Sequence, residues 1–232
     1  MARHCLTCHW LGLFALALAQ PVAAARSVSG SVTAPQGAAI AGAVVFLQEP
    51  SPSPSPSPSP SPSPSPPPSA SEHAAAVVDQ VEKTFVPGIL PIMVGTYVRF
   101  PNHDQIQHHV YSFSPTKTFE LPLYKGEAAP AVLFDKVGVV KIGCNIHDWM
   151  SGIILVLPTP HFTVTDAGGK YVLENVPEGN YTLVVWHAQS NVKPEDTARP
   201  IPIREEVANV NFTLTLSPAR LRPAVHGSRS DP

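Results

Sequence analysis

Short runs of apolar and β-branched residues, bounded by Gly, Pro, Asn and Asp, recur along most of the chain. Two runs, residues 30–34 and 42–48, come before a serine-proline repeat, and ten more follow it between residues 89 and 216. They are too short for amphipathic helices and have the composition of strands. Because one eight-stranded sandwich would not use them all, the pattern predicts an all-β chain with two β domains.

Proline content supports this fold class, because 28 prolines among 232 residues exclude an even spread of helix. Many of them lie in the repeat at residues 50–70, which we interpret as a linker extending as polyproline II. The linker is either a spacer with a function or an insertion tolerated at the surface, and we favour the tolerated insertion.

The N-terminus has the charged, apolar and small-residue regions of a secretory signal peptide, which we assign to residues 1–25. A retained transmembrane anchor is the alternative, but the apolar run is shorter than the roughly 20 residues that span a bilayer. We therefore expect cleavage and export to the periplasm without stable membrane insertion. Cleavage removes Cys5 and Cys8, together with the "CLTCH" pattern that resembles a haem attachment site. Cys144 then has no partner for an intramolecular disulfide, and we expect no haem.

Charge changes this picture little, since the 15 basic and 17 acidic residues are scattered along the chain. Neither a basic groove for nucleic acid nor a polybasic membrane patch is predicted.

Candidate chemistry centres on residues 144–150, "CNIHDWM", where Cys144, His147 and Met150 follow one another at three-residue intervals. We expect "NIHDWMS" to be a loop between two strands, which would curl these side chains around one point. A thiolate, two imidazoles and a weak thioether form the donor set of blue copper, whereas zinc prefers more thiolates, a carboxylate or water.

The second imidazole must come from another strand end. The stretch "NHDQIQHHVYSF" offers His103, His108 and His109.

These motifs resemble the cupredoxin family, in which the upstream ligand begins "HNV" and amicyanin has a Cys-x-x-His-x-x-Met loop. This chain reads "HHV", so the resemblance implies that His108 is the ligand and that His109 replaces the usual Asn. Asp148 stands where amicyanin has proline, and an acid there could alter how readily His147 protonates.

Residues 76–158 resemble more closely the cupredoxins called methylamine-utilisation proteins, which carry "CNIH" with a nearby Met and "H-x-V-x-S". The resemblance implies a Greek-key sandwich with one type 1 copper per chain, held by His108, Cys144 and His147 with Met150 at the axis. It also implies electron transfer with redox protein partners.

A different signature follows in "TDAGGKYVLENVPEGNYTLVVWH", which resembles the carboxypeptidase regulatory-like, transthyretin-type sandwich. We assign residues 159–216 to it, and residues 26–49 are its possible first part, interrupted by the linker and the cupredoxin domain. The alternative is that residues 29–48 belong to the cupredoxin sandwich. His161 and His187 have no suitably spaced partner for a second metal site, and we expect residues 217–232 to be a disordered tail.

The leading functional hypothesis is a periplasmic blue-copper protein that carries single electrons. A copper chaperone or storage module without redox function is the alternative, and a structural or adhesive β protein is a third reading. We expect no enzyme, because the sequence shows no paired carboxylates, nucleophile elbow or open three-histidine copper site.

Overall fold

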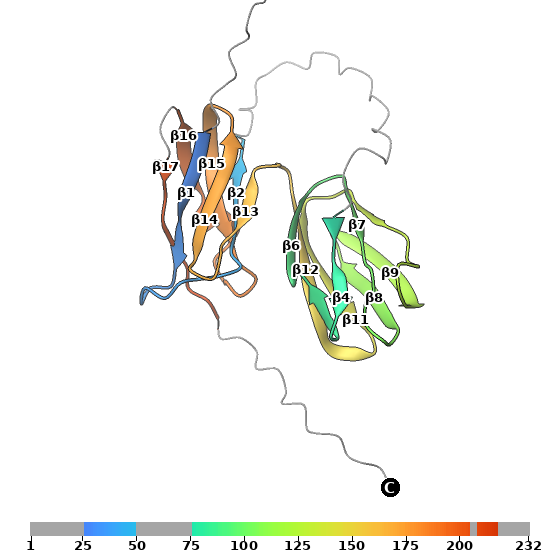
Figure 1. Cartoon of the computed structure of the whole chain (residues 1–232). Helices are drawn as coiled ribbons and strands as arrows, with labels where there is room; N and C mark the ends of the chain where they lie inside the picture. The colour runs from blue at the N-terminus through green and yellow to red at the C-terminus, as the bar shows by residue number, and fades with distance from the viewer. Residues whose placement is uncertain (1–25, 50–75, 205–207, 218–232) are drawn as a thin grey trace, which may run out of the picture.

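The computed structural model describes residues 26–49, 76–204 and 208–217 (Figure 1). The expected signal peptide (1–25), the expected linker (50–70) and residues 218–232 of the expected tail lie outside the described residues. In the part that the structure describes, no helix has the length and apolar character needed to cross a membrane.

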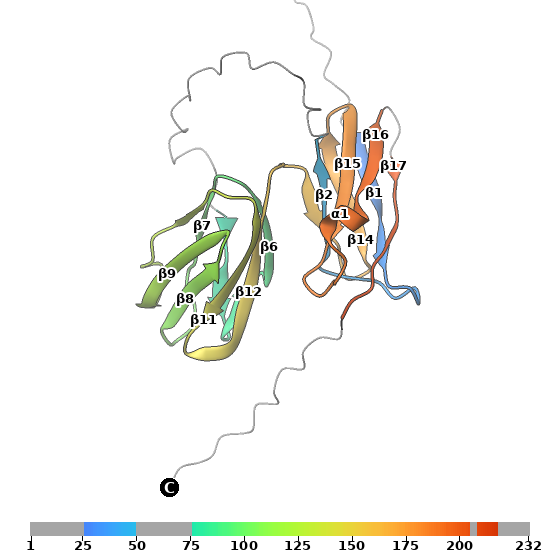
Figure 2. The ribbon, with the colours of Figure 1, turned by 180° about the vertical axis from the view of Figure 1, so that it is seen from behind.

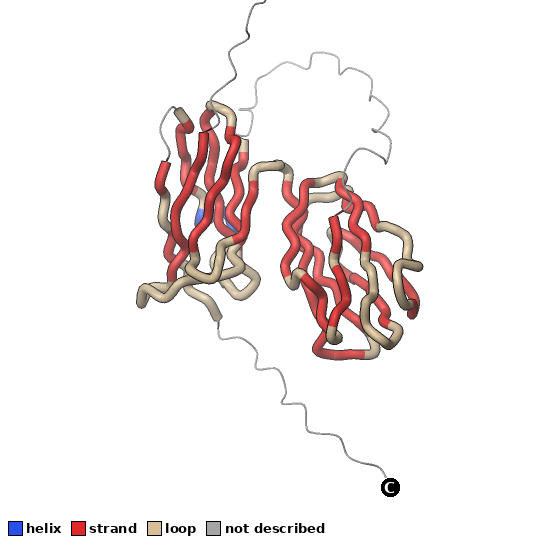
Figure 3. The backbone as a smooth tube through the Cα atoms, in the orientation of Figure 1, coloured by secondary structure: helices blue, strands red, loops and turns tan. Residues whose placement is uncertain are grey.

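Strands β3 to β12, which cover residues 76–157, build one sandwich, called here the first sandwich (Figures 1 and 3). Its large sheet has the order β6-β12-β11-β8-β9, and a smaller sheet has the order β10-β7-β3, with β4-β5 as a separate hairpin. Apolar side chains from both sheets form one buried core. The strands are β3 (Ala76–Val77), β4 (Asp79–Val81), β5 (Thr84–Val86), β6 (Ile89–Met93), β7 (Thr96–Arg99), β8 (His108–Ser114), β9 (Lys117–Tyr124), β10 (Val132–Phe134), β11 (Gly138–Cys144) and β12 (His147–Leu157).

The remaining strands build the second sandwich, with its own buried core. One sheet has the order β14-β1-β17, with β18 also paired to β1, and the other has the order β13-β2-β15-β16. The elements are β1 (Arg26–Thr33), β2 (Val44–Gln48), β13 (Phe162–Val164), β14 (Lys170–Val176), β15 (Gly179–Trp186), α1 (Pro194–Thr197), β16 (Arg199–Ile203), β17 (Ala208–Asn209) and β18 (Phe212–Thr213).

The two strands that precede the linker pair with strands from the far end of the chain. β1 pairs with β14, β17 and β18, and β2 pairs with β13 and β15. The absence of a side chain at Gly30 lets the backbone at Val210 pack closely against β1, since an added Cβ would lie 1.8 Å from the Val210 carbonyl oxygen. Among the described residues, neither β1 nor β2 pairs with a strand of the first sandwich.

The second half of strand β12, residues 154–157, is buried on both faces and connects the two sandwiches. Ile154 and Val156 enter the core of the first sandwich, whereas Leu155 and Leu157 pack in a separate cluster with residues of β2 and β15. Figures 1 and 2 show β6 and β12 on the side of the first sandwich that faces β2 and β13. The unbroken apolar run "GIILVL" is therefore explained by burial on two faces.

The structure differs from the sequence-based expectation in two places. Strands β3, β4 and β5 occupy residues 76–86, where the short apolar runs are too mixed with polar residues to predict strands. The expected loop "NIHDWMS" was too long, because β12 already begins at His147 and only Asn145 and Ile146 form the turn. Pairing of Cys144 with His147 closes this tight hairpin.

Candidate metal centre

Three strands bring the candidate ligands to one end of the large sheet. β8 begins with His108, β11 ends with Cys144, and β12 begins with His147. β11 pairs with both β8 and β12, so the ends of these strands are held side by side.

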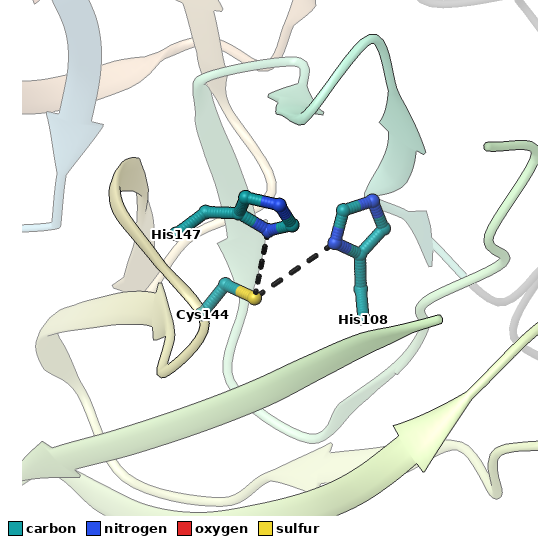
Figure 4. A group of neighbouring side chains, drawn as sticks. All are labelled: His108, Cys144 and His147. Carbon is teal, nitrogen blue, oxygen red and sulfur yellow. Dashed lines mark hydrogen bonds between the residues drawn. The ribbon is translucent and has the colours of Figure 1, made fainter. Parts of the chain in front are cut away.

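The three side chains converge on one point, as Figure 4 shows. The Cys144 Sγ atom lies 3.8 Å from His108 Nδ1 and 3.6 Å from His147 Nδ1. One ligand atom from each residue lies within 4.8 Å of the others. The predicted grouping of these three residues is therefore present in the structure.

Burial differs among these residues. His108 is fully buried, Cys144 is buried, and His147 is partly exposed. Met150, the predicted axial donor, is 2% exposed and belongs with Cys144 to the core of the first sandwich. The centre thus lies at the edge of an apolar core, with one imidazole toward the surface.

The spacing of the donor atoms fits a metal ion. Metal–sulfur and metal–nitrogen bonds of about 2.3 and 2.0 Å, opened to a trigonal angle, separate sulfur from nitrogen by about 3.7 Å. The two observed separations agree with this value. One thiolate and two imidazole nitrogens with a nearby methionine form the donor set of type 1 copper.

The far side of the His108 ring contacts a carboxylate. His108 Nε2 lies 2.6 Å from Asp104 Oδ2. Burial raises the pKa of Asp104, but hydrogen bonds from the Lys83 amide, His108 and the Glu82 amide outweigh it and leave the pKa below its ordinary value. Sequence analysis missed this residue, because it precedes His108 by four positions in an irregular segment, where that spacing predicts no contact.

His147 has a different environment. Burial lowers its pKa most, proximity to His108 and Lys83 lowers it further, and Asp104 acts in the opposite direction. The ring therefore stays neutral, and able to bind metal, to a lower pH than an ordinary histidine. Asp148, which the sequence suggested as an influence on His147, is exposed and is not among the groups that shift its pKa.

The other histidines that the structure describes do not belong to this group of metal ligands. His109 Nε2 is 2.8 Å from Glu120 Oε1, and the exposed His103 pairs with Asp79 at 2.8 Å. His161 packs near the ring of Tyr181 in the second sandwich. Among the residues that the structure describes, the group formed by His108, Cys144 and His147 is the one found with metal-ligand spacing.

Comparison with protein-family models gives no match, and comparison with curated proteins gives none either. Among solved structures, the chain is similar to a copper-containing nitrite reductase from Thermus scotoductus SA-01, with 29% identity over 37% of this chain and a TM-score of 0.35. It is also similar to an oxidised amicyanin variant, with 26% identity over 37% of this chain and 87% of the amicyanin, and a TM-score of 0.34. A purple cupredoxin from Nitrosopumilus maritimus aligns with 26% identity over 35% of this chain and 99% of its own, with a TM-score of 0.32. The chain spans 23% of the length of the nitrite reductase.

Proposed function

We propose that the first sandwich is an amicyanin-like cupredoxin domain that binds one type 1 copper ion and carries single electrons. The observation that carries this proposal is the convergence of the Cys144 thiol and two histidine Nδ1 atoms, with the buried Met150 in the same core cluster as Cys144. A copper ion held there supplies reversible one-electron exchange. This donor set fits copper better than zinc because a thioether is a soft ligand.

Each residue has a separate role in this proposal. Cys144 supplies the thiolate, and His108 and His147 supply neutral imidazole nitrogens. Met150 would supply a weak thioether donor that tunes the relative stability of the two oxidation states. His147 is the ligand that reaches the surface, so a redox partner would approach the site from its side.

The wider context of the protein follows as part of the same proposal. The N-terminal pattern supports export through a cleaved signal peptide and a location in the periplasm. The partners would be redox proteins that give and take one electron, and the chain would have no enzymatic activity of its own.

We assign residues 76–158 to the cupredoxin domain, and residues 26–49 with 159–216 to a discontinuous second domain. The pairing of β1 and β2 with β13, β14 and β15 supports this division. Its two-sheet architecture is compatible with a carboxypeptidase regulatory-like, transthyretin-type sandwich.

A redox titration of the copper-loaded protein, followed by visible absorption, tests the proposed function. A carrier is expected to bind one copper per chain and to pass reversibly between an intensely coloured and a colourless form. Bound copper without reversible cycling would favour a chaperone or storage module. Failure to bind copper would leave a structural β protein.

A further inference from the structure

The carboxylate of Asp104 connects a buried metal-ligand candidate to a turn elsewhere in the sandwich. Its Oδ2 atom faces His108 Nε2 at 2.6 Å and accepts a hydrogen bond from the Lys83 amide at 2.8 Å. Its Oδ1 atom accepts from the Glu82 amide at 2.6 Å. The Asp104 side chain is 13% exposed and that of His108 is 0% exposed, so water competes little for the contact.

These contacts determine which nitrogen of His108 carries a proton. An ionised carboxylate accepts hydrogen bonds and cannot donate them, and Asp104 already receives two amide hydrogens. Nε2 of His108 must therefore be the donor. In a neutral ring the lone pair is then on Nδ1, which is the atom that faces Cys144 Sγ.

The position of Asp104 is itself fixed on two sides. Glu82 and Lys83 form the turn between β4 and β5 with φ angles of 51° and 56°, which aims both amides at one carboxylate. On the other side, the Asp104 amide donates to the Asn102 side-chain oxygen at 3.0 Å. Asn102 in turn donates to the Tyr124 carbonyl at 2.8 Å, in the strand that pairs with β8.

We propose that Asp104 is a positioning residue for the metal centre, which fixes the Nε2–H tautomer and the ring orientation of His108 and brings a negative charge next to this ligand. The inference deepens the proposed copper function and rests on it. Partners of this kind raise the basicity of a ligating imidazole, and their loss typically lowers metal affinity about 10–100-fold. A negative charge beside the ligand also favours the more highly charged, oxidised copper ion.

Two other histidine–carboxylate pairs in the same sandwich provide matched comparisons. Asp79 pairs with His103, and Glu120 pairs with His109, yet neither histidine belongs to the metal-ligand group. Asp79 is the better control because it lies in the β4–β5 hairpin, whose turn amides donate hydrogen bonds to Asp104. Asp79→Asn removes a carboxylate from a histidine pair without touching His108.

The first experiment uses the metal-free protein and nitrogen NMR of the histidine rings at about pH 8, above the ordinary histidine pKa of about 6.5. We expect His108 to carry its proton on Nε2 in the wild type and in Asp79→Asn, and to lose this single tautomer in Asp104→Ala. A wild-type His108 protonated on Nδ1 would overturn the inference. This wild-type measurement can overturn the inference even if the Asp104 variant does not fold.

The second experiment measures copper affinity and midpoint potential of the wild type, Asp104→Asn and Asp79→Asn. Asp104→Asn is expected to bind Cu(II) about 10–100-fold more weakly and Cu(I) with a smaller loss. Each tenfold difference between the two losses raises the potential by about 59 mV. Asp79→Asn is expected to leave both properties unchanged.

Equal potentials in the wild type and Asp104→Asn would show that Asp104 is only structural. If the wild type binds no copper while His108 still shows the Nε2–H tautomer, the proposed function fails and the contact itself stands. The two failures are therefore distinguishable.

Discussion

At the scale of single residues, two neighbouring histidines have separate environments. His108 lies between Cys144 and Asp104, whereas His109 pairs with Glu120 on the same strand pair. Both are buried, so burial alone does not distinguish them. Their contacts do, because only His108 points a ring nitrogen at the thiol.

Alanine substitution at each position tests this assignment. His108→Ala removes an imidazole ligand and is expected to abolish the intense thiolate-to-copper absorption. His109→Ala is expected to keep the band and to change only potential or stability. Visible spectra of the two copper-loaded variants check the prediction, and the opposite pattern would move the ligand by one residue.

Met150 permits a finer test of the proposed axial role. Met150→Leu removes a soft donor from a buried position and favours reduced copper, so the midpoint potential is expected to rise. Met150→Gln supplies a harder oxygen donor, so the potential is expected to fall. The band is expected to persist in both variants, and Leu should cost less than about 1.5 kcal/mol of stability because it is similar in volume.

Voltammetry of the wild type and the two Met150 variants measures these shifts. Potentials that stay constant, or change in the reverse order, would show that Met150 only fills the core.

The sequence predicted some site residues better than others for a physical reason. Cys144 and His147 are separated by two residues in one hairpin, so their proximity follows from local spacing. The contact between Asp104 and His108 depends on amides in a turn 21 and 22 residues upstream of Asp104, which a local pattern does not reveal.

At the scale of elements, continuous apolar runs mark the strands buried on both faces. In β2, Val45 and Leu47 enter the core of the second sandwich, while Val44 and Phe46 pack toward β12. The pattern of short apolar runs bounded by Gly, Pro, Asn and Asp predicted such strands readily. It did not predict β4 and β5, because these three-residue strands carry few apolar residues and are held by a hairpin turn.

His187, which follows the last residue of β15, is expected to make the stability of the fold depend on pH. Burial lowers the pKa of His187, with a backbone hydrogen bond to Ala41 acting in the opposite direction. Its Nδ1 atom accepts a hydrogen bond from the Gln189 amide, which protonation would remove. Because the folded pKa is below the unfolded value of about 6.5, this stabilising contribution is complete above that pH and is lost as the pH falls through the folded pKa.

Denaturant unfolding of the metal-free protein measures this effect over about pH 7.5 to 5, a range that includes the ordinary histidine pKa of about 6.5. The free energy of unfolding is expected to fall more steeply in the wild type than in His187→Asn, whose amide oxygen can accept the same hydrogen bond without titrating. Equal slopes would show that His187 does not contribute.

At the scale of the whole molecule, the two sandwiches share an apolar contact and are built from interleaved segments. Leu155 and Leu157 of the first sandwich pack against Val44, Phe46 and Val184 of the second. β2 also depends on β13 and β15 for its hydrogen bonds. The two strands before the linker, β1 and β2, therefore depend on the segment after residue 158 for their partner strands.

Truncation after Pro158 tests this dependence. The shortened chain keeps β1 and β2 but loses all their partners, so it is expected to expose apolar surface and to aggregate. Size-exclusion chromatography against the full chain provides the measurement. A monomeric product with ordered residues 30–45 would instead place these strands in the cupredoxin sandwich.

The central claim about the whole molecule is that it is a copper protein in which Cys144 binds the ion as a thiolate, together with two imidazoles. The most direct test is the visible absorption spectrum of the protein loaded with one equivalent of Cu(II), recorded beside that of Cys144→Ser. We predict an intense thiolate-to-copper band in the wild type and its complete loss in the variant. A wild type without the band, or a variant that retains it, would contradict the assignment of this centre.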